Sequence, residues 1–158
     1  MACASGSVRA TAEEKKDVIP AGWQEVRDAS VGFSVPMPTG AAPKTVDGHP
    51  EYAAKSADGT DYTLDVLALP PEKPSEKTLL RLLTKLLGRC GDKLKLDGFI
   101  EKPAYASIHY GSHCADGSEW QGMVYIDHKH MLMLSARGPV GKLGITEPFF
   151  YQLQYLNN

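Results

Sequence analysis

Four short stretches of strand-forming residues follow one another in the second half of the chain, and they constrain the fold more than any other feature. Turn signals separate them at Pro103, at Asp116-Gly117 and at residues 127–129. Short strands joined by tight turns pair with their neighbours in antiparallel fashion. The stretches LKLDGFIEK, AYASIHYGSHC, SEWQGMVYI and HMLMLSARG are therefore predicted to form an antiparallel meander.

Two further pairs of strands are predicted in the first half of the chain. WQEVRDA and VGFSVPMP form the first pair, and the prolines Pro36 and Pro38 indicate a sheet edge or a strand end. The Pro- and Gly-rich residues that follow are predicted to form a loop. HPEYAAKSA and TDYTLDVLAL form the second pair around Asp58-Gly59, a strong hairpin signal because glycine accepts a positive φ.

Two helices are predicted to cover this sheet. Ser75 is a suitable N-cap after a proline-rich break, and a second helix begins at Thr146-Glu147-Pro148. Helices packed on an antiparallel sheet define the α+β class, which is the fold class predicted here. The apolar stripes are Leu79, Leu82, Leu83, Leu86 and Leu87 on the first helix, and Phe149, Phe150, Leu153 and Leu156 on the second.

Length and charge limit the classes of protein. A chain of 158 residues with 42% hydrophobic residues can bury one core, and residues 21–158 are predicted to form a single domain. Residues 1–20 are mostly small, polar or charged and are predicted to be a flexible tether. The formal net charge of -2, with no basic patch among the aromatic residues, argues against nucleic-acid binding. We expect a monomer rather than an obligate oligomer.

Three cysteines suggest a compartment. A Cys90–Cys114 disulfide would require an oxidising environment, and the alternative is two reduced thiols in the cytoplasm. Cys3 follows an alanine and precedes a small, polar tract, as the acylated cysteine of a bacterial lipoprotein does. If a signal peptide preceded this chain, the protein is expected in the periplasm or at the cell surface, held by a lipid anchor. The alternative is an ordinary cysteine in the tail of a cytoplasmic protein.

No assembled catalytic motif is found in the sequence. Ser34 lies in GFSVP, which lacks the second glycine of a nucleophile elbow, and residues 138–144 lack the glycine spacing of a phosphate loop. We therefore expect no enzymatic activity and no cofactor. A metal site remains an alternative hypothesis, because imidazoles on neighbouring strands can bind metal. Its candidate ligands are His109, His113, His128 and His130.

Four basic residues recur at every fourth position on the first predicted helix. Such a ridge could bind an acidic partner or lipid headgroups, and it could also be an ordinary solvated face. Two of these residues interrupt the richest leucine segment, so no stretch reaches the roughly 20 apolar residues that a membrane span needs. The residues of this basic ridge are Lys77, Arg81, Lys85 and Arg89.

The order of these elements resembles the PsbP-like superfamily. The resemblance covers residues 22–156 and includes Trp23, the GFSVPMP strand, two Asp-Gly hairpins on either side of a proline-introduced helix, and the closing EPFFYQLQYL. This superfamily contains DcrB-type bacterial envelope lipoproteins and a eukaryotic Ran-binding import factor. The resemblance implies an α/β/α sandwich and a non-enzymatic accessory or adaptor protein of the bacterial envelope that binds another protein. The alternatives are a small-ligand or metal carrier, and a cytosolic chaperone or immunity-type binder.

Overall fold

The computed structural model describes residues 18–87 and 94–156. This part of the chain contains ten strands and two helices. The helices are α1 Glu76–Leu87 and α2 Glu147–Tyr151. The strands are β1 Trp23–Asp28, β2 Phe33–Pro38, β3 Ala42–Val46, β4 His49–Lys55, β5 Asp61–Leu67, β6 Lys95–Glu101, β7 Ala106–His113, β8 Ser118–Ile126, β9 Met131–Pro139 and β10 Gln154–Tyr155.

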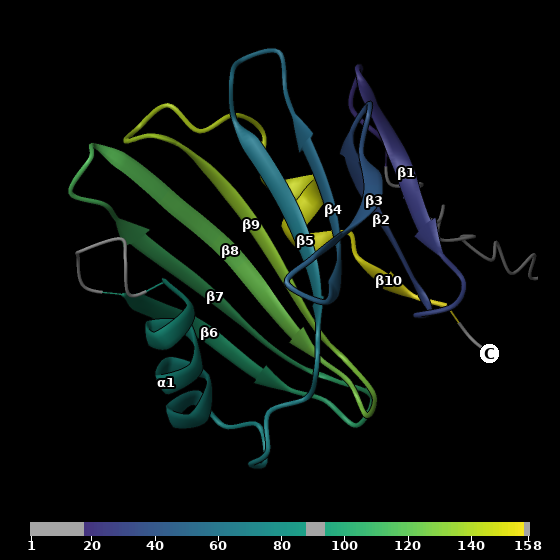
Figure 1. The fold of residues 1–158 in the computed structure, drawn as a ribbon, viewed down its shortest axis with the longest axis vertical. Coiled ribbons are helices and arrows are strands. Elements are labelled where there is room, and N and C mark those ends of the chain that lie inside the picture. Colours follow the sequence, from purple (N-terminus) through teal and green to yellow (C-terminus); the bar gives the residue numbers. More distant parts are fainter. Residues whose placement is uncertain (1–17, 88–93, 157–158) are drawn as a thin grey trace, which may run out of the picture.

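The strands form two antiparallel sheets (Figure 1). The larger sheet has seven strands in the order β3-β4-β5-β9-β8-β7-β6, and the smaller has three in the order β1-β2-β10. Helix α1 packs on one face of the large sheet, while the small sheet and α2 pack on the other. The predicted α+β class and antiparallel sheet are confirmed. The outer layer opposite α1 is, however, mainly a second sheet rather than a helix.

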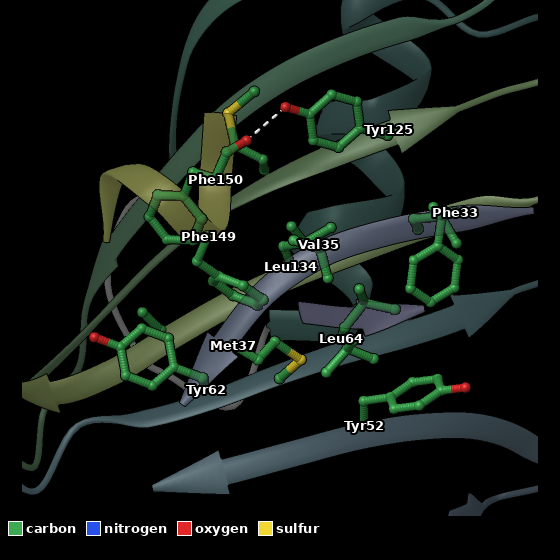
Figure 2. Packing of buried hydrophobic residues seen from close by; sticks show 14 of the residues in the cluster. Phe33, Val35, Met37, Tyr52, Tyr62, Leu64, Tyr125, Leu134, Phe149 and Phe150 are labelled. Carbon is green, nitrogen blue, oxygen red and sulfur yellow. Dashed lines mark hydrogen bonds between the residues drawn. The ribbon is translucent and has the colours of Figure 1, made fainter. Parts of the chain in front are cut away.

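The main core lies between the two sheets (Figure 2). Alternate residues of β2 point into it, and Phe33, Val35 and Met37 are fully buried. From the large sheet, alternate residues of β5 meet them, including Tyr62 and Leu64. Phe149 and Phe150 of α2 complete this core, as the second predicted apolar stripe requires. Tyr125 donates a hydrogen bond of 2.5 Å to the Phe150 carbonyl oxygen and ties α2 to β8.

A second core lies under α1. Leu79 and Leu83 are fully buried against the other face of β7, β8 and β9. The predicted start of this helix is confirmed, because the Ser75 hydroxyl accepts a hydrogen bond of 3.1 Å from the Thr78 backbone N–H. Leu86 departs from the predicted stripe: it lies in the last turn, past the leucines that meet the sheet, and is 45% exposed.

The predicted loop before β4 is wrong, because it contains the edge strand β3. Asp47 and Gly48 both have positive φ, 49° and 82°, so β3 turns tightly into β4. Most of β3 is exposed and therefore shows no alternation of apolar and polar residues. An edge strand also tolerates Pro43, which cannot donate a ladder hydrogen bond.

The second helix is shorter than predicted. It ends at Tyr151, and the chain then forms β10, which pairs with Phe33 and Ser34 at the start of β2. Beyond that pairing the Leu156 N–H donates to the Gly32 carbonyl oxygen at 2.9 Å. The C-terminal segment thus satisfies backbone groups of β2 that would otherwise lack a hydrogen-bond partner. This pairing decides the local structure, although the spacing of Leu153 and Leu156 favours a helix.

Candidate functional site

The small sheet and α2 leave part of the large sheet uncovered, and a groove of about 500 Å³ lies over β6, β7 and β8. We call it the β6–β8 groove. Most of its polar side chains point to the same side of the sheet as α2, since the His109 ring packs against Phe150 with 6.1 Å between ring centroids. The lining residues are Lys95, Asp97, His109, Gly111, Ser112, His113, Glu119, Trp120 and Gln121.

Glu119 is the buried carboxylate of this groove, with a side chain that is only 9% exposed. Its Oε1 accepts a hydrogen bond of 2.9 Å from the Gly141 backbone N–H. Its Oε2 accepts one of 3.4 Å from the Gln121 side-chain amide and lies 3.6 Å from Nε2 of His113. Glu119 therefore orients Gln121 and holds the turn after β9 against the end of the groove.

His109 is a half-buried histidine on the groove floor. Burial lowers its pKa, and the nearby Asp97 carboxylate opposes this effect only in part. The imidazole is therefore neutral at pH 7 and carries one N–H donor and one acceptor nitrogen. Among the residues that the structure describes, neither ring nitrogen has a hydrogen-bond partner.

The other end of the groove floor carries two exposed charges. Lys95 and Asp97 lie two residues apart on β6, and neither forms an ion pair within residues 18–87 and 94–156. Gly111 pairs opposite Lys95, and Asp97 pairs opposite His109. A Cβ at Gly111 would meet only the Trp120 carbonyl oxygen, at 3.9 Å. The glycine therefore leaves open space above this face of the sheet.

The four predicted metal-binding histidines are not brought together. His109 and His113 line the groove, whereas His128 and His130 lie in the turn between β8 and β9. This turn adjoins Ala106, and His113 lies seven residues farther along β7, roughly 23 Å away. No group of three or more His, Cys, Asp or Glu side chains in the described part of the chain is placed to hold a metal ion.

The basic ridge lies on the exposed side of α1. Lys77, Arg81 and Lys85 are all exposed, and Arg81 pairs with Glu72. Neither lysine has an ion-pair partner among the described residues. Arg89, the fourth predicted member, lies outside the described residues. The ridge therefore presents unpaired positive charge to the solvent.

The edges of the large sheet are poorly suited to adding another strand. The edge strand β3 contains Pro43 and Lys44, and the edge strand β6 has an irregular register between Asp97 and Ile100. Proline, charge and bulges are the usual means by which proteins block edge-to-edge pairing. Binding surfaces are thus better sought on α1 and on the sheet face than at the strand edges.

Of the three cysteines, Cys114 lies within the described residues. Cys3 and Cys90 lie outside the described residues, as do residues 1–17 of the predicted tether. Cys114 is 8% exposed and is not a free thiol. The Cys90–Cys114 pairing stays a prediction. No helix of the described part is long and apolar enough to cross a membrane.

Comparisons with known proteins define the fold class. No protein-family model matches the chain, and no curated protein matches it significantly. The Ran-binding protein Mog1p of Saccharomyces cerevisiae matches with a TM-score of 0.52 and 11% identity over 76% of this chain and 78% of that chain. Cyanobacterial PsbP (CyanoP) of Synechocystis sp. PCC 6803 matches with a TM-score of 0.51 and 14% identity over 78% of this chain and 84% of that chain. This chain has a PsbP/Mog1-like α+β fold.

A third solved structure supports the same fold. A mutant of protein Mog1 matches with a TM-score of 0.50 and 12% identity, over 76% of this chain and 79% of that chain. The predicted resemblance to the PsbP-like superfamily is therefore confirmed for the fold. Membership of the DcrB-type lipoproteins stays a prediction.

Proposed function

We propose that this protein is a non-enzymatic accessory protein that binds another protein through the basic ridge of α1. The observation that carries the proposal is the unpaired charge of Lys77 and Lys85 on an exposed helix face. Leu80, which is 41% exposed on the same helix, adds apolar surface beside the charge. The shared fold gives further support, since one protein that has it binds Ran. An acidic partner surface fits this ridge.

In-cell crosslinking tests this proposal. A photoreactive residue at Thr84, exposed on α1 next to the ridge, would crosslink the partner in the native cell. The triple variant Lys77→Glu, Arg81→Glu, Lys85→Glu is expected to reduce the crosslinked product at least tenfold, because like charges would then face each other. The control variant Lys129→Glu, Lys142→Glu changes charge in exposed turns and should leave the product unchanged. Equal crosslinking by the triple variant would reject the ridge.

We also propose a location in the bacterial cell envelope, with Cys3 as the lipid-anchored residue and residues 1–20 as the tether. The small, polar tract after Cys3 motivates this proposal. Mass spectrometry of the protein expressed with its native leader is the test. We expect a cleaved chain that begins at an acylated Cys3. An unmodified, uncleaved N-terminus would place the protein in the cytoplasm instead.

The β6–β8 groove favours a second candidate function, that of a small-ligand carrier. Pockets of about 300–1,000 Å³ are typical of small-molecule sites, and the groove falls within this range at about 500 Å³. Its polar groups come from three neighbouring strands and converge on one side of the sheet. A ligand in this groove and a protein partner on α1 could be bound by the same molecule.

A further inference from the structure

We propose that the β6–β8 groove binds a short zwitterionic peptide, with the carboxylate of the peptide at Lys95 and its amino group at Asp97. The site is separate from the basic ridge and does not depend on the protein partner. The groove leaves one positive and one negative group without a partner, at a spacing that a short peptide can bridge.

The charges of the groove favour a ligand with one charge of each sign. Lys95 and Asp97 have no ion-pair partner in the described part of the chain. Glu119 already has hydrogen-bond donors at both carboxylate oxygens, so it does not need a cation from the ligand. A simple anion would be repelled by Asp97, and a simple cation by Lys95. A zwitterion satisfies both residues at once.

The spacing of these charges fits a dipeptide. Residues i and i+2 of a strand point to the same face and lie about 6.6 Å apart along it. Two extended residues span at most about 7 Å, so the two ends of a dipeptide can reach both Lys95 and Asp97. A groove of about 500 Å³ has room for two side chains in addition to this backbone.

The remaining groups match the peptide bond. Gln121 donates its amide N–H to Glu119, which leaves its carbonyl oxygen as an acceptor in the groove. His109 is neutral and can donate from one ring nitrogen. The ligand's amide N–H and C=O can therefore be satisfied by Gln121 and His109. The missing side chain at Gly111 leaves space for the ligand between Lys95 and Gln121.

Titration with L-alanyl-L-alanine tests the proposal, monitored on the ¹⁵N-labelled protein by amide chemical shifts. We expect saturable shifts in β6, β7 and β8. N-acetyl-alanyl-alanine and alanyl-alanine amide, each lacking one terminal charge, should bind about tenfold more weakly. The absence of saturable shifts at 20 mM dipeptide would overturn the proposal, as would a capped peptide that binds as tightly as the free dipeptide.

Three variants assign the contacts. Asp97→Asn should weaken binding of the free dipeptide about tenfold and leave binding of the N-acetylated peptide unchanged. Lys95→Met should also weaken binding of the free dipeptide about tenfold, and should leave binding of the amidated peptide unchanged. Gly111→Val fills the groove on a strand that accepts a β-branched residue and should abolish binding. Thr63→Val, the control on another strand of the same sheet, should bind as the wild type does. Unchanged binding by Gly111→Val would overturn the proposal, because the peptide would then bind elsewhere. The amide spectrum of each variant shows whether that variant is folded.

Discussion

Two glycines on neighbouring strands have opposite roles. Gly122 on β8 lies under the ring of Tyr110, and the Tyr110 hydroxyl lies within hydrogen-bonding distance of Ser135, at 2.5 Å. A Cβ at Gly122 would overlap this ring and the Leu134 carbonyl oxygen. Gly111 on β7 has open space instead. The same residue type therefore allows close packing at one position and leaves the β6–β8 groove open at the other.

The substitution Gly122→Ala is expected to destabilise the protein by about 2–3 kcal/mol, because overpacking forces the buried Tyr110 ring or the backbone to move. Gly111→Ala is the matched control and should be neutral or slightly stabilising, since its Cβ meets only one atom within 4 Å. Urea unfolding measures both differences. Equal stabilities of the two variants would contradict the packing of Tyr110 described above.

Asp28 connects the two sheets and is expected to make stability depend on pH. It accepts a hydrogen bond of 2.6 Å from the Tyr52 hydroxyl on β4. Burial acts to raise the pKa of Asp28, but hydrogen bonds from Ser30, Tyr52 and Val31 outweigh it and hold the pKa below the usual value of 3.8. Since the folded pKa is the lower one, the stabilisation is present above about pH 4 and is lost as the pH falls through the folded pKa.

The variant Asp28→Asn should therefore unfold at a lower urea concentration than the wild type at pH 7. The difference should narrow as the pH is lowered below about 4, because the wild-type carboxylate then becomes protonated. Asp47→Asn is the control: Asp47 is exposed, and asparagine accepts its φ of 49°. A difference between Asp28→Asn and wild type that is independent of pH would show that the carboxylate charge is not involved.

Among the elements, α1 was predicted most completely and β10 was missed. The start of α1 depends on Ser75 and its leucine stripe depends on spacing along a single helix, so local rules suffice. The second predicted helix followed the same rules, yet the chain left it after Tyr151. The reason is the start of β2, whose backbone accepts a strand from residues about 120 positions later.

Removal of the N-cap tests the local stabilisation of α1. Ser75→Ala is expected to reduce the free energy of unfolding by about 1 kcal/mol, since the Thr78 N–H loses its acceptor. Thr84→Ala on the exposed side of the same helix should be neutral or stabilising, because alanine is the better helix former. Unfolding curves followed by circular dichroism compare the two. Unchanged stability of Ser75→Ala would contradict the assignment of Ser75 as the N-cap.

For the whole molecule, the disulfide prediction has the largest consequence. A Cys90–Cys114 bond would stabilise the fold by about 3 kcal/mol on the chain-entropy model, by restricting the unfolded chain. Reduction should therefore lower the melting temperature. In a chain whose Cys3 is unmodified, a thiol count in denaturant should find one free thiol before reduction and three after it. Three thiols in protein kept from air would instead support the cytosolic binder.

Local patterns in the chain were enough to predict the meander, the Asp-Gly hairpins, α1 and the PsbP-like order of elements, because alternation, turns and caps act between near neighbours. They also singled out His109 and His113. The tertiary structure alone decided that His113 lies roughly 23 Å from the turn that carries His128 and His130. It also decided that Glu119 meets the turn after β9, and that part of the sheet stays uncovered. Such features depend on strand register and on contacts between distant segments, which periodicity does not encode.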